Sequence, residues 1–252
     1  MDINKIYNED CLETMAKMPD NFLDLTVTSP PYDNLRTYTG DMTWNEDVWK
    51  NIIKELYRTT KEGGVVVWVV GDATIKGSET GSSFRQALWA MVCGFNLHDT
   101  MMWQKLNPVP LTHNRYEQGF EYMFILSKGK PNTINHIREK STCIQTRTRR
   151  KSNKENGSAF RSREEYTTTK PTKIKTNVWA YTNSNKKLDH PAIFPEQLAN
   201  DHIISWSNKG DIVYDPFMGS GTTAKMAKLN NRKYIGSEIS KEYCEIIEQR
   251  LS

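Results

Sequence analysis

Cysteine is scarce in this chain, and the spacing of the few cysteines excludes two common kinds of site. The 252 residues include four cysteines, and no two of them form a Cys-x-x-Cys pair. Neither a structural zinc site nor a disulfide framework is therefore predicted. The five histidines also lack the spacing of metal ligands, so we expect no metal. Isolated thiols of this kind are typical of a reduced, cytoplasmic protein.

Long hydrophobic runs are absent as well. Purely apolar runs such as Val65–Val70 have the length of a strand and are far too short to cross a bilayer. The segment Met1–Asn4 does not resemble a secretory signal. We therefore expect a cytoplasmic protein without a membrane partner.

Acidic residues are nearly missing from one long stretch. Between Lys128 and Lys187 the chain has 16 Lys and Arg against 4 Asp and Glu, whereas the remainder has 18 against 26. The stretch thus carries a balance of +12 and the remainder one of −8. An acidic body with one basic stretch repels a polyanion everywhere except at that stretch, which is the focusing that a nucleic-acid contact surface needs. A solvated loop is the alternative interpretation.

Two short segments carry the functional signal. Thr28-Ser29-Pro30-Pro31-Tyr32 closes the apolar run Leu23–Val27, and Asp215–Thr223 follows the strand-like Asp211–Tyr214. The second segment reads Asp-Pro-Phe-Met-Gly-Ser-Gly-Thr-Thr and leads into helix-forming residues. A glycine-rich turn between a strand and a helix lets the backbone approach a ligand and directs free N–H groups at it. Because open α/β sheets bind ligands at the carboxyl ends of strands, we expect one segment to hold a cofactor and the other the reacting group.

The order of the predicted elements indicates the fold class. Short apolar strands alternate with helices, which is typical of a doubly wound, mostly parallel α/β sheet. Strands are predicted at Lys5–Asn8, Leu23–Thr28, Val65–Val70, His98–Gln104, Glu121–Ser127, Asp211–Tyr214 and Lys233–Ser237. Helices are predicted at Trp49–Thr60 (stopped by Gly63-Gly64), from Ser82 or Ser83 to Cys93, at Pro195–Trp206 and at Ser240–Leu251.

The polar stretch Asn132–Lys187 interrupts this alternation. It has no sustained period, and its densest charge cluster is Arg147-Thr148-Arg149-Arg150-Lys151. A loop of this length in a compact domain is either functional or disordered. Its aromatic residues suit either stacking on bases beside phosphate contacts or the minor core of a small subdomain; they are Phe160, Tyr166, Trp179 and Tyr181.

Two chemistries compete for the glycine-rich turn. Gly219–Ala224 satisfies the loose dinucleotide fingerprint, and Glu238 lies about twenty residues further on, where a ribose-binding carboxylate is expected. A nicotinamide oxidoreductase is therefore one hypothesis. Asp215 opposes it, because a carboxylate at the strand tip repels a pyrophosphate and suits the ammonium group of a methionine moiety. Asp215 and Glu238 then anchor the amine and the ribose hydroxyls of S-adenosylmethionine, or, on a third interpretation, only cap helices.

Ser29-Pro30-Pro31-Tyr32 is interpreted as the place of the reacting group. Its two prolines remove two N–H donors and fix the backbone, so nearby carbonyl oxygens face the pocket as acceptors. Together with the Ser29 hydroxyl and the flat ring of Tyr32, these acceptors can hold an exocyclic amine of a planar base and direct its lone pair at an electrophilic methyl group. A merely rigid Pro-Pro turn is the alternative.

With both motifs in this order, the chain resembles the amino-group DNA methyltransferases of the beta arrangement. In that family a (Ser/Asp/Asn)-Pro-Pro-(Tyr/Phe) motif precedes an Asp-Pro-Phe-x-Gly-Ser-Gly-Thr motif, and the resemblance spans nearly the whole chain. It implies a seven-stranded, Rossmann-like methyltransferase fold of circularly permuted order, S-adenosylmethionine as cofactor, and direct attack by a flipped-out base. No cysteine follows a proline, so the Pro-Cys nucleophile of carbon-5 cytosine methyltransferases is missing.

The resemblance also divides the chain. Residues 1–127 are the catalytic half, 128–187 the basic target-recognition insertion and 188–252 the cofactor-binding half. His190–Pro195 resembles the segment that closes over the methionine end of the cofactor. Asn8–Cys11 resembles the N-terminal turn, whose acidic residue at the adenine is here Asp10, and Gly71-Asp72 matches a pocket-lining position more loosely.

The implied site residues form three sets. The catalytic set is Ser29, Pro30, Pro31 and Tyr32. The cofactor-binding set is Asp10, Cys11, His190, Pro191, Asp215, Pro216, Phe217, Gly219, Ser220, Gly221, Thr222, Glu238 and Ile239. The DNA-binding set is Arg147, Arg149, Arg150 and Lys151.

The identity of Ser29 bears on the target base. Within the resembling family, a serine at this position most often accompanies methylation of cytosine N4, and an aspartate that of adenine N6. We therefore expect N4 methylation of cytosine in double-stranded DNA, with adenine N6 as the alternative. An NAD-dependent oxidoreductase and a catalytically inactive DNA-binding module are more distant alternatives. The resemblance also implies a restriction-modification setting with a cognate restriction endonuclease as partner, and a homodimer.

Overall fold

The computed structural model describes the chain outside residues 32–43, 109–114, 142–145, 153–160, 168–169 and 183–194. Two compact units divide it. Met1–Asn135 and Asn177–Ser252 together form one unit, called the body, and His136–Thr176 forms the other, called the hairpin unit. The hairpin unit is shorter than the predicted insertion 128–187, because the residues on either side of it pack with the body.

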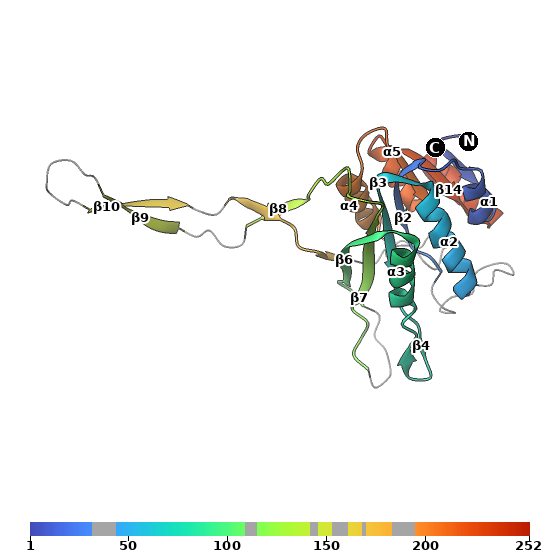
Figure 1. Cartoon of the computed structure of the whole chain (residues 1–252), viewed down its shortest axis with the longest axis horizontal. Coiled ribbons are helices and arrows are strands. Elements are labelled where there is room, and N and C mark those ends of the chain that lie inside the picture. The colour runs from blue at the N-terminus through green and yellow to red at the C-terminus, as the bar shows by residue number, and fades with distance from the viewer. Residues whose placement is uncertain (32–43, 109–114, 142–145, 153–160, 168–169, 183–194) are drawn as a thin grey trace. The chain divides into compact units, whose positions relative to one another are not determined.

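Eight strands of the described part of the body form one sheet, in the order β1-β14-β13-β2-β3-β7-β6-β12 (Figure 1). Strand β7 is antiparallel to its neighbours β3 and β6, and all other neighbouring strands of this sheet are parallel. The mostly parallel sheet predicted from the sequence is therefore confirmed. The strands are β1 (Lys5–Tyr7), β2 (Leu23–Thr28), β3 (Thr60–Val70), β6 (Asn96–Lys105), β7 (Phe120–Ser127), β12 (Val178–Tyr181), β13 (Ile212–Asp215) and β14 (Lys233–Ser237).

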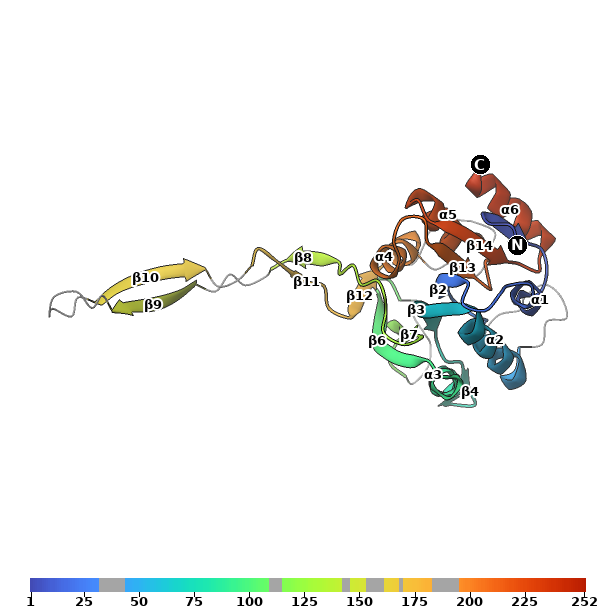
Figure 2. The same ribbon diagram turned by 45° about the horizontal axis from the view of Figure 1, so that its top comes forward.

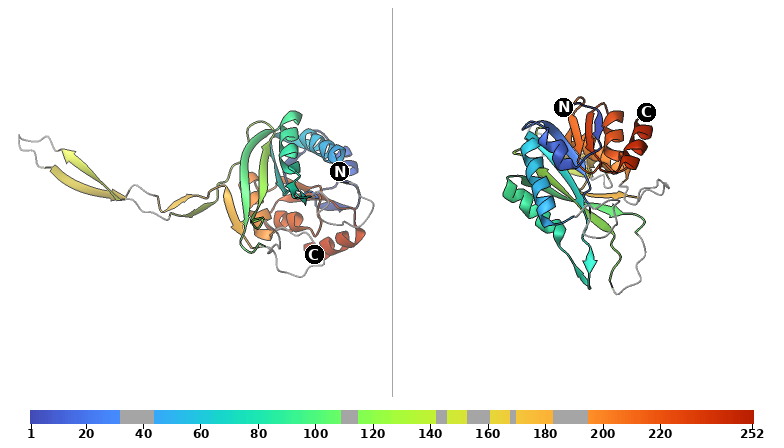
Figure 3. Two further views of the ribbon diagram at one scale, coloured as in Figure 1. Left: turned by 90° about the horizontal axis from the view of Figure 1, so that it is seen from below. Right: turned by 90° about the vertical axis from the view of Figure 1, so that its right-hand side faces the viewer.

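Six helices in the described residues cover the two faces of this sheet. Figures 2 and 3 show α1, α2 and α3 on one face and α4, α5 and α6 on the other, which is the doubly wound arrangement. Their bounds are α1 (Cys11–Ala16), α2 (Glu46–Thr59), α3 (Ser82–Cys93), α4 (Glu196–Trp206), α5 (Thr222–Leu229) and α6 (Lys241–Leu251).

The central strand β3 explains why this sheet needs helices on both sides. From Val65 to Val70 every residue is at most 1% exposed, although successive side chains point to opposite faces. Trp49, Ile52, Ile53 and Leu56 of α2 belong to the core on one of these faces. Continuous apolar runs are typical of strands buried in this way.

Two helix ends show where local signals hold and where they fail. Gly94, with φ 114°, ends α3 as predicted, because glycine adopts the left-handed conformation that the cap requires. The predicted stop of α2 at Gly63-Gly64 is wrong. The helix ends at Thr59, and Thr60 already pairs with Leu23, so both glycines lie inside the long strand β3.

Val178–Tyr181 is the eighth strand, which the sequence did not predict. As β12 it pairs in parallel with β6, with Trp179 opposite Trp103. Trp179 and Tyr181 are 5% and 8% exposed. These two aromatic residues are therefore part of the main core, and neither of the two roles predicted for them applies.

Short ladders complete the structure. In the body, β4 (Thr74–Ile75) and β5 (Ser78–Glu79) form a small hairpin. The hairpin unit holds two antiparallel ladders, β8 (Arg138–Lys140) with β11 (Thr172–Ile174) and β9 (Thr146–Ser152) with β10 (Arg161–Thr167). Among the described residues, no helix is long and apolar enough to cross a membrane.

Candidate active site

The two motifs meet because the strands that deliver them are neighbours. β2 and β13 are parallel, with Leu25 opposite Val213 and Thr26 opposite Tyr214. Their carboxyl ends therefore lie side by side, and each motif begins where its strand ends (Figure 2). This is the edge at which open α/β sheets place their ligands.

Asp215 forms the junction between the two motifs. It is the last residue of β13 and is 1% exposed. Its Oδ1 accepts hydrogen bonds from the Thr28 hydroxyl at 2.6 Å and from the Phe217 N–H at 3.0 Å. Its Oδ2 accepts one from the Thr223 hydroxyl at 2.8 Å. The carboxylate thus joins the end of β2, the glycine-rich turn and the start of α5.

Burial raises the pKa of Asp215 to about 6 from its ordinary 3.8. Removal from water disfavours the charged carboxylate, and this effect outweighs the three hydrogen bonds that favour it. The hydrogen bonds from Thr28, Phe217 and Thr223 favour the charged form of Asp215 and limit this rise in its pKa. The acidic anchor predicted for the cofactor amine is enclosed by groups of the chain itself.

The glycine-rich turn has the backbone conformation that only glycine adopts readily. Gly219 and Gly221 have φ of 52° and 82°, and a Cβ on Gly221 would lie 3.0 Å from Ile247 of α6. Thr222 begins α5, and its hydroxyl is buried without a hydrogen-bond partner among the described residues. An orphaned hydroxyl beside the unbonded first N–H groups of a helix suits a polar ligand. The turn therefore fits a cofactor.

Ser220 faces the other side of the turn. Its carbonyl oxygen and its hydroxyl both accept from Arg250 of α6, the hydroxyl at 2.9 Å. Arg250 is in turn paired with Glu196 of α4 at 2.7 Å. Ser220 thus fixes the turn against α4 and α6 through its hydroxyl and its carbonyl oxygen, and its backbone N–H is what remains for a cofactor.

Glu238 follows β14 and braces the same turn. Its two carboxylate oxygens accept from the N–H groups of Gly219 and Ser240, each at 2.8 Å. Burial raises its pKa, and the residue is 9% exposed. Asn8, which sequence reasoning assigned no role of its own, donates to the carbonyl oxygens of Glu238 and Ile239 at 2.9 and 3.0 Å.

The N-terminal turn leads into the same region. Asp10 is exposed and caps α1 by accepting from the Leu12 N–H at 2.7 Å. Cys11 is 5% exposed, and burial together with the nearby carboxylates of Asp10 and Asp215 raises the pKa of its thiol. Cys11 is therefore an uncharged, apolar residue beside the candidate site.

Of the catalytic motif, the structure describes Ser29, Pro30 and Pro31. The two prolines are buried, and Ser29 is partly exposed beyond the end of β2. Tyr32 lies outside the described residues, as do His190 and Pro191. Phe217 of the other motif meets Trp44 and Trp68 edge to face, with ring centroids 5.5 and 6.3 Å apart. Trp44 had no sequence signal beyond being aromatic.

Asp72, two residues after β3, has a structural role. Its Oδ1 accepts from the Ser83 N–H at 2.9 Å and its Oδ2 from the Ser83 hydroxyl at 2.5 Å, so it holds the first turn of α3. Ser82 and Thr80 donate to it as well, at 3.2 and 3.3 Å. No group of three or more candidate metal ligands occurs in the described part of the chain.

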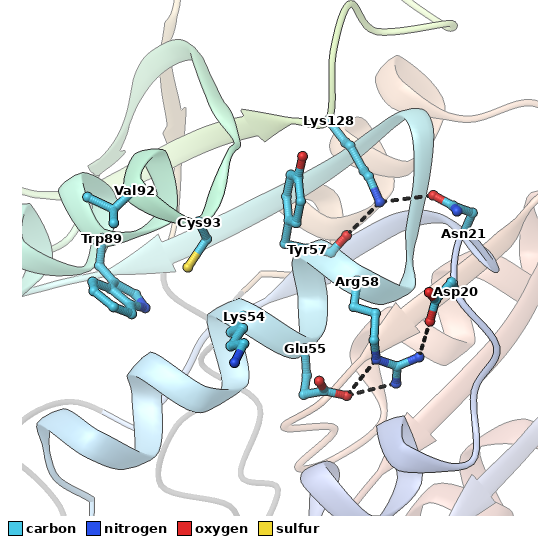
Figure 4. Close-up of a pocket in the computed structure, with 10 residues that line it drawn as sticks. All are labelled: Asp20, Asn21, Lys54, Glu55, Tyr57, Arg58, Trp89, Val92, Cys93 and Lys128. Atoms are coloured by element: carbon cyan, nitrogen blue, oxygen red, sulfur yellow. Dashed lines mark hydrogen bonds and ion pairs between the residues drawn. The ribbon is translucent and has the colours of Figure 1, made fainter.

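A pocket of about 590 Å³ lies at the opposite edge of the sheet (Figure 4). It is bordered by Asp20 and Asn21, which precede β2, and by Lys128, which follows the antiparallel β7. Two of its cations already have partners: Arg58 pairs with Glu55 and Asp20, each at 2.7 Å, and Lys128 donates to Asn21 at 2.9 Å. This pocket is not the site of the two motifs.

The predicted DNA-binding residues all lie on β9 of the hairpin unit. In the ladder with β10, Arg147 stands opposite Tyr166, Arg149 opposite Glu164 and Arg150 opposite Arg163. Lys151 stands opposite Ser162.

Comparisons with known proteins support what this geometry suggests. The chain has the fold of PvuII DNA methyltransferase (cytosine-N4-specific), with a TM-score of 0.75 at 22% identity over 98% of this chain and 86% of that one. It also superposes on the complex of M1.HpyAVI with its cofactor SAM (TM-score 0.63, 22% identity, 98% and 99% covered). The fold is therefore that of a methyltransferase, as predicted.

The sequence comparisons are more specific. The model of the DNA methylase family N6_N4_Mtase matches residues 23–249. The orphan methyltransferase M.BamHII of Bacillus amyloliquefaciens is 56% identical over 92% of this chain and 89% of its own length. The type II methyltransferase M.BglII of Bacillus subtilis is 31% identical over 99% and 69%. The chain belongs to the N6/N4 DNA methylase family, which confirms the resemblance.

Proposed function

We propose that this chain transfers a methyl group from S-adenosylmethionine to the exocyclic N4 amine of cytosine in double-stranded DNA. The observation that carries the proposal is the junction at Asp215, which brings Ser29-Pro30-Pro31 and the glycine-rich turn to one edge of the sheet. DNA methylation itself follows from family membership. That membership replaces the nicotinamide oxidoreductase hypothesis.

The predicted cofactor is confirmed at the level of the family, since the chain is a DNA methylase and M1.HpyAVI was solved with SAM. The turn Gly219–Thr222 and Glu238 would hold it, with Asp10, Cys11, Pro216, Phe217 and Ile239 around them. His190 and Pro191 belong to the same predicted set. When bound, the cofactor supplies a methyl group on a positively charged sulfur. Asp215 contributes by holding the turn.

The chain's own contribution to the reaction is positioning. The hydroxyl of Ser29 and the carbonyl oxygens next to Pro30 and Pro31 accept the two N–H bonds of the target amine, and Tyr32 stacks on the base. The amine nitrogen would then direct its lone pair at the methyl group and form the N–C bond as the methyl–sulfur bond breaks, with S-adenosylhomocysteine as the leaving group. The surplus amine proton would afterwards pass to water. Orientation of this kind accounts for several powers of ten in rate without a covalent enzyme intermediate.

The choice of cytosine over adenine rests on Ser29 and on the likeness to a cytosine-N4-specific fold neighbour. Adenine N6 is the second candidate, favoured by the DNA adenine methyltransferase YhdJ of Escherichia coli, which is 27% identical over 98% of this chain. Both targets present an exocyclic amine with two N–H donors. The side chain of Ser29 is neutral and shorter than that of the aspartate found in other members of the family. Its hydroxyl oxygen therefore reaches a shorter distance toward the target amine than a carboxylate oxygen would.

The test is to methylate DNA in vitro with labelled S-adenosylmethionine and to identify the modified nucleoside by mass spectrometry. We expect N4-methylcytosine. N6-methyladenine alone would contradict the cytosine assignment and leave the rest of the mechanism intact. Cofactor binding without transfer to any DNA would instead support the catalytically inactive DNA-binding module.

The remaining predicted partners are also proposals. The name type II methyltransferase of M.BglII favours a cognate restriction endonuclease, whereas M.BamHII is called an orphan. A homodimer is proposed as well, and α3 offers the surface on which to test it. Its exposed apolar side chains are Phe84, Leu88, Met91 and Val92, at 49%, 61%, 47% and 73%. The cytoplasm is the proposed place of action.

A further inference from the structure

Thr28 is the residue through which the catalytic motif is fastened to the rest of the site. It is the last residue of β2, it is 0% exposed, and it directly precedes Ser29-Pro30-Pro31. Its hydroxyl donates to Asp215 at 2.6 Å, across 187 positions of sequence. This length is typical of a strong hydrogen bond to a charged acceptor.

The acceptor is shared with the cofactor turn. The same Oδ1 of Asp215 receives the Phe217 N–H, and Oδ2 receives the Thr223 hydroxyl. A buried carboxylate that loses one of its few donors is costly, so this group of bonds resists displacement of any single member. The end of β2 and the turn that follows β13 are thereby held at a fixed separation.

The backbone beyond Thr28 transmits this constraint to the reacting end. Each proline fixes its own φ near −65°, so Pro30 and Pro31 leave few soft torsions between Thr28 and the acceptors of the site. A shift at Thr28 is therefore carried into the carbonyl oxygens and the Ser29 hydroxyl. Displacements of about 1 Å in such groups cost on the order of a hundredfold in rate.

We propose that Thr28 is a positioning residue for methyl transfer, and that Asp215 is the shared acceptor that ties the catalytic turn to the glycine-rich turn rather than a free anchor for the amine of the cofactor. The proposal rests on the proposed function, since it assigns turnover to one turn and the cofactor to the other. It concerns two residues of the same junction and adds no chemical step.

The chain offers a matched control for the first part. Thr26 lies two positions before Thr28 on β2, so both side chains point to the same face of the sheet. Both are 0% exposed, but the Thr26 hydroxyl has no hydrogen-bond partner among the described residues. Thr26→Val and Thr28→Val thus remove the same group from the same strand, and only Thr28→Val breaks the bond to Asp215.

Steady-state methylation of DNA is measured for the intact chain and for Thr26→Val, Thr28→Val and Thr28→Ser, together with calorimetric binding of S-adenosylmethionine. A hydrogen bond to a charged group corresponds to a fall of roughly tenfold to a hundredfold in kcat. We expect that fall in Thr28→Val, with the affinity for the cofactor within about threefold of the unmodified chain. Thr28→Ser keeps the hydroxyl and should recover most of the turnover. Thr26→Val should match the unmodified chain.

Asp215→Asn tests the second part. The amide oxygen can still accept from Thr28 and Phe217, and the amide N–H₂ can donate to the Thr223 hydroxyl. That hydroxyl is then free to donate to the Val27 carbonyl oxygen, which is 3.2 Å away. If Asp215 is the shared acceptor, the variant should bind S-adenosylmethionine within a few fold of the unmodified chain. A loss of roughly tenfold or more would show that the negative charge itself holds the ammonium group.

The outcomes separate this inference from the proposed function. If the kcat of Thr28→Val equals that of Thr26→Val, the positioning role of Thr28 is overturned. The positioning role is also overturned if Thr28→Val loses as much affinity for the cofactor as it loses turnover. The substitution would then act through cofactor binding. An unmodified chain that transfers no methyl group to any DNA contradicts the proposed function instead, and melting curves identify a variant that has failed to fold.

Discussion

The body and the hairpin unit are built on different physical terms. In the body, β3 is covered on both faces by helices, and Val65–Val70 are at most 1% exposed. In the hairpin unit each ladder has two strands, β11 is exposed along its whole length, and Ile174 is 49% exposed. An isolated two-stranded ladder is marginally stable in water, whereas a sheet packed on both faces is held by burial. Burial therefore stabilises the body, whereas the exposed strand β11 adds little burial to the hairpin unit.

The comparison teaches where change is tolerated. The hydrogen bonds at Asp215 join the two motifs at 2.6 and 2.8 Å, so we expect substitutions there to act on turnover. The basic residues of β9 would act on a polyanion through electrostatic attraction, which depends on charge more than on exact placement. Three experiments follow, from the largest expected effect to the smallest.

Removal of the distal part of the hairpin unit should have the largest effect. Lys140 and Thr172 are opposite each other in the ladder of β8 and β11, so residues 141–171 can be replaced by the two-residue turn Asn-Gly. We expect S-adenosylmethionine binding and the melting temperature to be retained, because the core lies in the body. Methylation of DNA should fall by on the order of a hundredfold or more, since most phosphate contacts would be lost.

Filter binding and methyl-transfer assays check this deletion against the intact chain. Retained methylation would show that recognition resides elsewhere. A lowered melting temperature would show that the hairpin unit also stabilises the body.

The pH dependence of stability should reveal the buried carboxylate of Asp215. Its pKa is about 6 in the folded protein against an ordinary 3.8, so between about pH 4 and pH 6 the folded chain keeps a proton that the unfolded chain has released. The stability that this group contributes is full below pH 4, is lost as the pH rises to 6, and is constant above that. The two-unit shift corresponds to about 3 kcal/mol.

Asp215→Asn removes this titration and serves as the comparison. Urea unfolding from pH 4 to pH 8 should show the free energy of unfolding of the variant rising relative to that of the unmodified chain up to about pH 6, with a constant difference above that pH. A difference that stays constant across this range would mean that Asp215 is as easily ionised when folded as when unfolded.

Charge reversal on β9 should have the smallest effect, and the size of that effect should depend on the salt concentration. Arg147, Arg149 and Arg150 changed together to Glu should weaken DNA binding and lower the slope of log affinity against log salt by up to about 0.9 for each lost phosphate contact. The matched control reverses Lys54, Lys209 and Lys233, exposed lysines of the body, with the same change in net charge. Equal slopes in the two triple variants would show that the β9 cluster only faces solvent.

Much of the fold could be predicted because its signals are local. The strand β2 was predicted with its observed bounds, and α3 with its glycine end, since apolar period and a left-handed cap are read within a few residues. The eighth strand could not be predicted. Val178–Tyr181 is short and lies within the polar, aperiodic stretch Asn132–Lys187, and only its pairing with β6 makes it a strand.

The candidate site shows the same division. The residue types, their order and the turn chemistry around Gly219 and Gly221 could be read directly, and they were sufficient to indicate the family that the comparisons confirm. The hydrogen bond between Asp215 and Thr28 could not be predicted, and neither could the one that Asn8 donates to Glu238. Both bonds join segments far apart in the chain.

The sequence by itself determined which chemistry the chain carries. A serine and two prolines after one strand, and glycines after another, have conformational and hydrogen-bonding properties that belong to the residues themselves. Only the tertiary structure decided that Thr28 and Asp215 share a hydrogen bond and that Asp215 is enclosed rather than open. The physical reason is that burial and long-range pairing depend on how the whole chain packs, and no local pattern specifies them.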